Sequence, residues 1–194
     1  MESRPELRGV TPPNSVEAER SVLGAMLQDD NAVEQACERL QGDDFYQPQH
    51  REIYDAMRKL HMEQSPVDII TVDTELSRRG TLEGVGGTAY LIELSQYVPT
   101  TANVKAYIAL VSEKSTLRRL IQAASTISRN CYEQRLDLKD ILSHAEKSIF
   151  DIVMRHTGGE QLVHIREVLY TTYAQIEELA RLQGKVAGVT TGFT

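Results

Sequence analysis

The sequence predicts an all-α protein: a compact helical bundle, then a long antiparallel helical hairpin, then a separate amphipathic helix. Three observations support this prediction. Apolar residues recur at steps of three and four along most of the 194-residue chain, which is the period of a helix face. Gly, Pro, Asp and Asn interrupt the first hundred residues at short intervals, as turns between short helices do. Residues 102–132 contain neither Pro nor Gly, which is typical of one long helix.

Composition narrows the class of protein. Hydrophobic residues make up 41% of the chain and charged residues 25%, as in soluble globular domains. The longest apolar run, residues 106–111, is far shorter than the roughly 20 residues of a membrane-spanning helix. The first ten residues contain no apolar core of a secretory signal, and two cysteines cannot build a disulfide framework. We therefore expect a reduced, cytoplasmic protein with no membrane partner.

Charge is unevenly distributed along the chain. The formal net charge is −7, yet residues 1–100 carry a net charge of −9 and residues 101–194 one of +2. An acidic chain is poorly suited to duplex DNA, whose binding depends on neutralising phosphates. The change near residue 100 indicates two units, a globular helical part at 14–100 and a hairpin at 101–155.

The globular part is expected to contain short helices behind a flexible tail at 1–13, which holds three prolines. The expected signals are a cap at Asn14 or Ser15, a break at Asp29 to Asn31, a helix start at Pro48, a stop at Gly80 and an end at Pro99. Residues 67–72 leave two alternatives open. Their β-branched side chains suit a strand, whereas Ile69, Val72 and Leu76 are spaced for a helix face that Asp68 could cap.

The hairpin is expected from two apolar stripes joined by a short polar turn at 133–137. The candidates for hairpin packing and for an oligomer interface are Val104, Ile108, Leu117, Ile121, Ala124, Ile127, Leu138, Leu142, Ile149 and Ile152. Their alternating steps of three and four are similar to those of coiled coils, so the stripes can form a seam with another chain. The alternative is that both stripes face the core of their own domain.

Beyond the hairpin, two glycines within residues 156–164 indicate a flexible link, and residues 165–184 form an amphipathic linker helix. Its expected docking residues are Ile165, Leu169, Ile176 and Leu179. Because an isolated short helix is marginally stable in water, this apolar face either folds back on the hairpin or, as we favour, docks on another surface. Residues 185–194 are interpreted as the truncated start of a further domain.

Motifs of catalysis are missing from the sequence. It contains no phosphate-binding loop of the form G-x-x-x-x-G-K-[ST], no G-x-S-x-G and no H-E-x-x-H. Residues 84–89 match the loose dinucleotide pattern G-x-G-x-x-A, but residues 78–83 before them cannot form the buried strand that this pattern requires. A tight turn between helices is the better interpretation. We therefore expect no catalytic, cofactor or metal site in this chain.

The other polar residues and the cysteines are interpreted as structural. We expect surface or rim positions for His50, His61, His144, His156 and His164, and solvated turns for Asp29, Asp30, Asp43 and Asp44. We expect surface charges at Arg78, Arg79, Arg118 and Arg119, off-face positions for Glu17, Glu19 and Arg20, and small core residues at Cys37 and Cys131.

Six segments, taken together, indicate a family. They are residues 12–24, residues 43–46 followed by His50 and Ile53, and residues 66–68, 85–91, 99–103 and 188–193. In this order and spacing they resemble the N-terminal domain of DnaB-type bacterial replicative DNA helicases. Residues 188–193 resemble the entry into the family's RecA-like ATPase domain, which the present sequence otherwise lacks.

The resemblance implies a role within a larger machine. Intact members of the family are hexameric ring helicases that use ATP and Mg²⁺ and move 5′ to 3′ on single-stranded DNA at the replication fork. Their N-terminal domains form a collar, a trimer of dimers made through helical hairpins, and the collar receives the C-terminal domain of primase. The linker helix docks on the ATPase domain of the next subunit. A helicase loader, and single-stranded DNA bound through the ATPase domain, are further implied partners.

For this chain we therefore expect a non-catalytic oligomerisation and primase-docking module. The residues expected to contact primase are Tyr90, Ile121 and Ile127. An aromatic side chain beside two apolar ones suits a protein-binding hot spot. The alternative is a helical module that binds single-stranded DNA, and the acidic first half with few stacking platforms argues against it.

Overall fold

The computed structural model describes residues 11–98, 100–133, 135 and 137–157, and every regular element among them is a helix. In chain order the elements are α1 (Val16–Met26), α2 (Asp30–Arg39), η1 (Gly42–Asp44), α3 (Pro48–Met62), α4 (Ile69–Arg79), η2 (Glu83–Val85), α5 (Gly87–Tyr97), η3 (Thr101–Asn103), α6 (Val104–Glu133) and α7 (Leu138–Thr157). The prediction of an all-α fold is confirmed, and the strand alternative for residues 67–72 is wrong. None of the described helices is long and apolar enough to span a membrane.

The chain divides into two units, Met1–His156 and Thr157–Thr194, and the fold described below is that of the first. Several predictions lie outside the described residues. They are the tail up to residue 10, the link from residue 158 on, the linker helix with Ile165, Leu169, Ile176 and Leu179, and residues 185–194.

Local capping signals set the helix boundaries. Ser15, Asp29 and Asp68 are the N-caps of α1, α2 and α4, and each side chain accepts a backbone N–H of the first turn. Pro48 occupies the first turn of α3, where no N–H is needed. Gly80 ends α4 in the left-handed region at φ 72°, which suits a residue without Cβ. These signals act within a few residues along the chain. The sequence predicts those at Ser15, Pro48 and Gly80, offers the Asp68 cap as one of two alternatives, and indicates only a break at Asp29.

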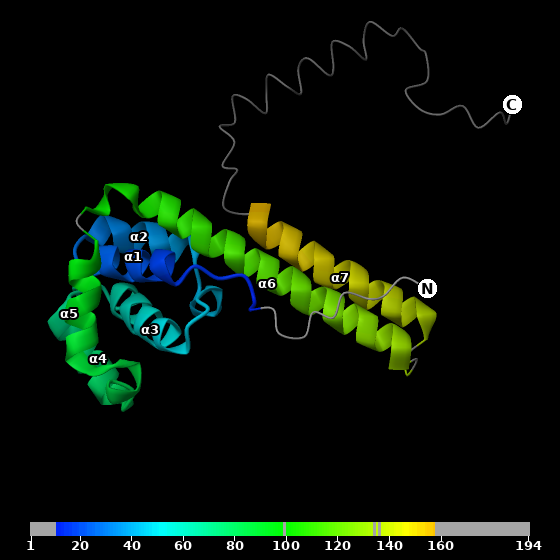
Figure 1. The fold of residues 1–194 in the computed structure, drawn as a ribbon, viewed down its shortest axis with the longest axis horizontal. Coiled ribbons are helices and arrows are strands. Elements are labelled where there is room, and N and C mark those ends of the chain that lie inside the picture. Colours follow the sequence, from blue (N-terminus) through cyan, green and yellow to red (C-terminus); the bar gives the residue numbers. More distant parts are fainter. Residues whose placement is uncertain (1–10, 99, 134, 136, 158–194) are drawn as a thin grey trace, which may run out of the picture. The chain divides into compact units, whose positions relative to one another are not determined.

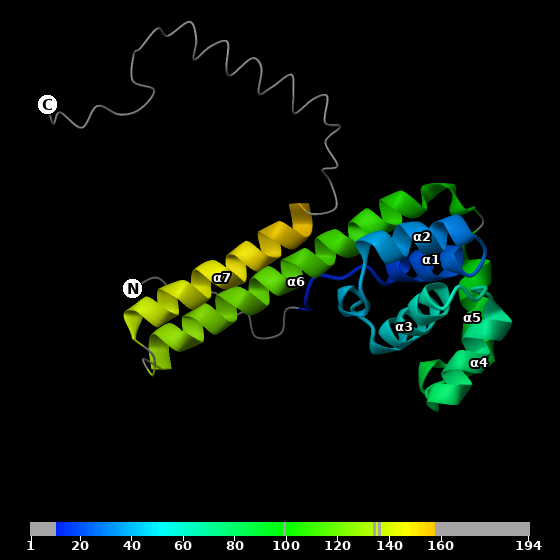
Figure 2. The ribbon, with the colours of Figure 1, turned by 180° about the vertical axis from the view of Figure 1, so that it is seen from behind.

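Helix α1 is the centre of the helical body, the part formed by α1–α5. It packs against α2, α3, α5 and α6, and its residues from Ser21 to Leu27 are all buried. Figures 1 and 2 show it enclosed by these helices. Gly24 allows α5 to approach closely, because a Cβ there would lie 2.2 Å from the carbonyl oxygen of Leu94. This crossing sets the position of α5.

The two longest helices form the predicted antiparallel hairpin. In both ribbon views α6 and α7 lie side by side, joined by a short turn at the end far from the body (Figures 1 and 2). The first turns of α6 belong to the core of the body, where Val104, Ile108 and Val111 are at most 4% exposed. The rest of α6 extends beyond this core, so one continuous helix links the body to the hairpin.

Four expectations about single residues are wrong. Asp44 and His50 are buried rather than exposed, because each finds polar partners from a distant helix. Arg118 is not a simple surface charge, because its guanidinium donates to the carbonyl oxygens of the body. Cys131 is exposed near the far end of α6, where no body helix covers it.

Candidate interaction surface

Beyond Ser115, α6 turns an apolar stripe to the solvent. Leu117 and Leu120 are each 38% exposed and Ile121 is 49% exposed, and Ala124 one turn later is also exposed. Their spacing of three, four and seven residues places them on one face of the helix. Three of the four, Leu117, Ile121 and Ala124, are interface candidates from the sequence, and this face is open in the structure.

Helix α7 carries a second open stripe. Leu138 is 72%, Leu142 61%, Ile149 41% and Phe150 59% exposed. A different stripe of α7 is turned inward, with Ile141 buried and Ile152 half-buried. On α7, therefore, fewer of these apolar side chains face α6 than face the solvent.

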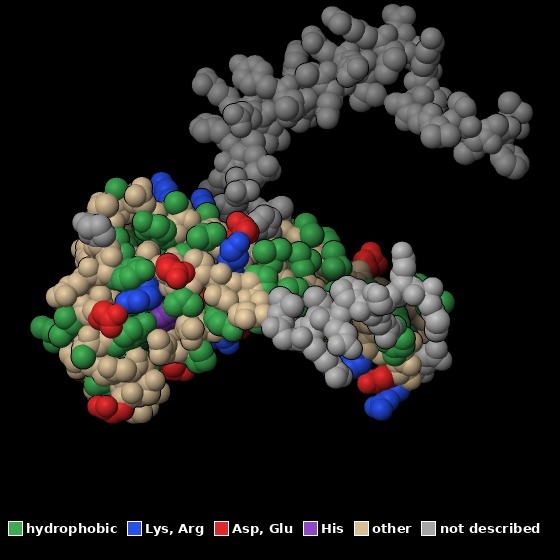
Figure 3. Space-filling view, in the orientation of Figure 1, with side chains coloured by type: hydrophobic (Ala, Val, Ile, Leu, Met, Phe, Trp, Pro, Cys, Tyr) green, Lys and Arg blue, Asp and Glu red, His purple; other side chains and the backbone are tan. Residues whose placement is uncertain are grey.

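The predicted hairpin residues thus fall into three groups. Val104 and Ile108 are core residues of the body, and Ile127 and Ile152 are half-buried. The exposed group consists of Leu117, Ile121, Ala124, Leu138, Leu142 and Ile149. On the face drawn in Figure 3, hydrophobic side chains gather over the hairpin helices. Contiguous apolar surface of this kind marks protein-interaction sites.

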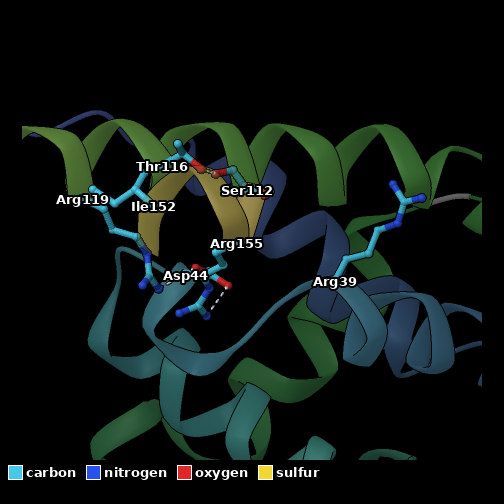
Figure 4. Close-up of a pocket in the computed structure, with 7 residues that line it drawn as sticks. All are labelled: Arg39, Asp44, Ser112, Thr116, Arg119, Ile152 and Arg155. Atoms are coloured by element: carbon cyan, nitrogen blue, oxygen red, sulfur yellow. Dashed lines mark hydrogen bonds and ion pairs between the residues drawn. The ribbon is translucent and has the colours of Figure 1, made fainter. Parts of the chain in front are cut away.

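The hairpin is held on the body by a polar joint around the Asp44 carboxylate. Oδ1 accepts the Ser115 hydroxyl at 2.6 Å and the Arg119 guanidinium at 3.0 Å, both from α6. Oδ2 accepts the backbone N–H of Gln41 at 2.7 Å and lies 3.7 Å from the Arg155 guanidinium of α7. One buried carboxylate therefore contacts both hairpin helices, as Figure 4 shows for Arg119 and Arg155.

A small cavity of about 30 Å³ lies beside this joint, between the hairpin and α2 (Figure 4). Its lining residues are Arg39, Asp44, Ser112, Thr116, Arg119, Ile152 and Arg155. On this measure a cavity of about 10–15 Å³ already holds one water molecule. The cavity therefore offers room for a water rather than for an organic substrate.

A second buried polar chain supports Tyr90 on α5. The Glu19 carboxylate lies 2.7 Å from Nδ1 of His50, and Nε2 of the same ring lies 2.7 Å from the Tyr90 hydroxyl. Since a carboxylate only accepts, Nδ1–H of His50 donates to Glu19, and Nε2 shares the second hydrogen bond of the chain with the Tyr90 hydroxyl. Partial burial raises the pKa of the Tyr90 hydroxyl. The hydroxyl therefore stays protonated and can donate.

The three residues expected to contact primase do not form one patch. Tyr90 lies on α5, which packs against α1 and α4, whereas Ile121 and Ile127 lie on α6. At 1.5 Å per residue, Ile121 is about 26 Å and Ile127 about 35 Å along α6 from Val104. Tyr90 is half-buried at the end of its hydrogen-bonded chain, Ile121 is open and Ile127 is half-buried. A partner touching all three would have to span the body and the hairpin.

Sequence reasoning missed the residues of the joint and of the buried chain. Asp44 and His50 lie in segments that carry the family resemblance, which was the only available signal for them. In the described part of the chain, no group of three or more His, Cys, Asp or Glu side chains is arranged to hold a metal ion. The open face of the hairpin is the largest exposed group of apolar candidates from the sequence.

Comparison with known proteins agrees with this geometry. A model of the family "DnaB-like helicase N terminal domain" matches residues 11–113. The chain is 44% identical over 184 residues to the replicative DNA helicase DnaC of Bacillus subtilis (strain 168), and 41% identical over 184 residues to the replicative DNA helicase DnaB of Geobacillus stearothermophilus. Each alignment covers 94% of this chain and 40% of the relative. The chain thus spans about 40% of the length of these curated relatives.

Solved structures show the same fold. The N-terminal domain of DnaB helicase from Mycobacterium tuberculosis matches with a TM-score of 0.70 at 40% sequence identity, over 73% of this chain and 99% of that one. A DnaB-like replicative helicase, described with its interactions with primase, matches with a TM-score of 0.63 at 26% identity, over 92% of this chain and 38% of that one. The family match spans more than half of the sequence and coincides with the helical body and the start of the hairpin. The chain therefore belongs to the DnaB-like helicase N-terminal domain family.

Proposed function

We propose that this chain is a non-catalytic assembly module of a replicative DNA helicase, which self-associates through its hairpin and receives primase. The observation that carries the proposal is the pair of apolar stripes that α6 and α7 expose beyond the body. The relatives named as replicative helicases support the process, and the DnaB-like helicase described with primase supports the partner.

Self-association is the physical consequence of the open hairpin. Completing the burial of a half-exposed Leu, Ile or Phe contributes about 1 kcal/mol. In a two-fold dimer each stripe residue is buried once on either chain. The seven exposed stripe side chains are Leu117, Leu120, Ile121, Leu138, Leu142, Ile149 and Phe150. Their burial supplies a free energy comparable with the roughly 4–15 kcal/mol that association costs. The hairpin therefore supports a dimer that depends on protein concentration, and three dimers would complete a hexameric collar.

Primase docking is the second part of the proposal. Ile121 offers an exposed anchor on α6, and Tyr90 offers an aromatic ring on the body whose hydroxyl is fixed by His50. Fixed aromatic and apolar side chains are the typical anchors of protein interfaces. Ile127 contributes only if the hairpin seam yields, since it is half-buried.

ATP hydrolysis, Mg²⁺ binding and strand separation belong, in this proposal, to the rest of the intact helicase. Among the described residues no group of three or more His, Cys, Asp or Glu side chains is arranged to hold a metal ion. Docking of residues 165–184 on a neighbouring subunit, and binding of a loader, stay predictions.

Light scattering on the purified chain tests self-association. We expect a mass that rises with concentration from 21.8 kDa to at least twice that value. The double variant Leu142→Ser with Ile149→Ser removes apolar area from α7 and should shift the mass toward the monomer. Ile70→Ser is the matched control, because Ile70 is 76% exposed on α4 of the body. A strict monomer at all concentrations, or equal effects of both changes, would refute the proposal.

Titration with the C-terminal domain of a primase tests docking. Ile121→Ser and Tyr90→Ala should each weaken binding by about tenfold or more, the usual effect of truncating an interface anchor. Ile70→Ser again serves as the control. Because Ile121 also lies on the proposed dimer face, the mass of each variant is measured alongside. Primase binding that is unchanged in both variants would contradict the docking surface while leaving self-association intact.

A further inference from the structure

A second, larger hollow lies where the hairpin meets the body. It has a volume of about 340 Å³ and shares Arg119 with the small cavity of Figure 4. Its lining residues are Asp43 and Arg51 from the body and Ser115, Arg118, Arg119 and Gln122 from α6. Every one of these side chains is polar. Three of the six are arginines, in a chain whose first hundred residues are strongly acidic.

Two of the arginines are anchored on consecutive carbonyl groups of the body. Nε of Arg51 donates to the carbonyl oxygen of Phe45 at 2.7 Å. Arg118 donates to the carbonyl oxygen of Asp44 and, at 2.9 Å, to that of Pro13. Because a guanidinium carries five N–H donors, both residues keep further donors after these contacts. The anchoring holds the two cations at the hollow without neutralising them.

Charge compensation within the hollow is incomplete. Arg119 is paired with the buried Asp44 carboxylate at 3.0 Å. The only pair of Arg51 among the described residues is Asp43 at 3.9 Å, whose side chain is 83% exposed. Arg118 has no ion pair in the described part of the chain. Burial lowers the pKa of its guanidinium, and the nearby Glu19 and Asp44 carboxylates offset this only in part. An anion entering the hollow would relieve this excess of positive charge.

We propose that this hollow is an anion site that takes a phosphate group. The guanidinium fork matches phosphate oxygens in pairs. With Arg119 paired to Asp44, Arg51 and Arg118 exceed the lining carboxylate of Asp43 by one charge. A phosphate monoester carries about 1.5–2 negative charges at pH 7 and inorganic pyrophosphate carries more, whereas a single carboxylate carries one. Gln122 adds an amide donor at the same hollow. The volume is at the lower end of the range of about 300–1,000 Å³ for small-molecule sites.

The same phosphate chemistry can come from a free phosphorylated metabolite or from a nucleic-acid backbone. An acidic peptide is the competing occupant, and it would present carboxylates instead. The three sources are separated by titrating each of them against the same protein.

Calorimetric titration of the full 194-residue chain with inorganic pyrophosphate, without divalent metal, is the direct test. Parallel titrations use oligo-dT and an oligo-glutamate peptide. We expect one pyrophosphate per chain. If oligo-dT displaces pyrophosphate, the site is assigned to a nucleic-acid backbone. If pyrophosphate binds and oligo-dT does not displace it, the site is assigned to a free phosphate compound. No binding of either phosphate probe, or preferential binding of the peptide, would overturn the proposal.

Three single-charge variants locate the site. Asp43→Asn removes the lining carboxylate and should tighten pyrophosphate binding by about fivefold, and Arg51→Gln should weaken it by about fivefold, as one unit charge about 5 Å away does in a water-like dielectric. Arg39→Gln is the matched control. Arg39 is exposed, lines only the small cavity, and has no ion pair among the described residues.

The control decides between a built site and general charge attraction. Arg39→Gln should change the affinity by less than about twofold. Equal effects of Arg39→Gln and Arg51→Gln would show diffuse attraction and overturn the proposal. Should Arg51→Gln fail to fold, Asp43→Asn decides alone, since a side chain as exposed as Asp43 contributes little to folding.

Discussion

Replacing Asp44 with Asn tests whether this carboxylate holds the hairpin on the helical body. The side chain is 7% exposed and accepts hydrogen bonds from Ser115, Arg119 and the backbone of Gln41. Asn keeps the size of the side chain but replaces one acceptor oxygen with an amide that only donates. Both oxygens of Asp44 accept hydrogen bonds, so the NH₂ group of Asn points at a donor whichever way the amide is turned. That donor is then left without an acceptor.

The expected cost follows from these contacts. Losing a charge-assisted hydrogen bond costs about 1.5–3 kcal/mol, and a buried N–H without an acceptor costs about 1–3 kcal/mol. The two costs sum to about 2.5–6 kcal/mol. Because Arg119 is 30% exposed and regains water, we expect a total near the lower end, about 2–3 kcal/mol. For a unit of this size, that loss lowers the melting temperature by roughly 5–10 °C.

Thermal unfolding followed by circular dichroism measures this effect. Asp43→Asn is the matched control, because the neighbouring carboxylate is 83% exposed and its removal should cost less than about 0.5 kcal/mol. The loosened joint should also reduce self-association, which light scattering at fixed concentration would report. Equal melting temperatures for the two variants would show that the joint does not stabilise the protein and would refute this reasoning.

Three further predictions follow from the body. Gly24→Ala should lower the melting temperature by several degrees despite the better helix propensity of Ala, because its Cβ would press on the carbonyl oxygen of Leu94. Gly84→Ala is the control and should be nearly neutral, because the space around Gly84 is open. A Gly24 variant with a higher melting temperature would contradict the close crossing of α1 and α5. Glu75, whose pKa its arginine and lysine partners lower from 4.5 to about 2, should stabilise the protein fully above pH 4.5 and progressively less as the pH falls toward 2. Urea unfolding of Glu75→Gln should therefore show a deficit at pH 7 that shrinks across this window, and a constant deficit would argue against the ion cluster. Tyr90→Phe should cost about 1 kcal/mol in the same assay, because the buried histidine of α3 loses its partner; an unchanged stability would show that water replaces the hydroxyl.

Local chemistry explains why the helix boundaries were predictable. A capping side chain such as Ser15 or Asp68 acts on backbone groups within three residues, and Gly80 ends its helix through its own conformational freedom. The helical period likewise requires only neighbouring turns. These effects are present in any stretch of the sequence, whatever the rest of the chain does.

Burial of polar groups was not predictable in this way. Asp44 is buried by Ser115 and Arg119, which lie 71 and 75 residues further along the chain, and the Glu19 partner of His50 lies 31 residues away. An acidic residue in a turn gives the same local pattern whether it is solvated or paired. Only the packing of α6 on the body brings the partners together and offsets the cost of removing charge from water.

The sequence by itself determined the all-α class, the hairpin and the periodic apolar stripes along it. The tertiary structure decided which parts of those stripes are covered. Val104 and Ile108 have the same spacing as Leu117 and Ile121, yet the first pair is buried and the second is exposed. The physical reason is that periodicity records which residues share a helix face, whereas exposure depends on whether another element reaches that face, and the body ends before the hairpin does.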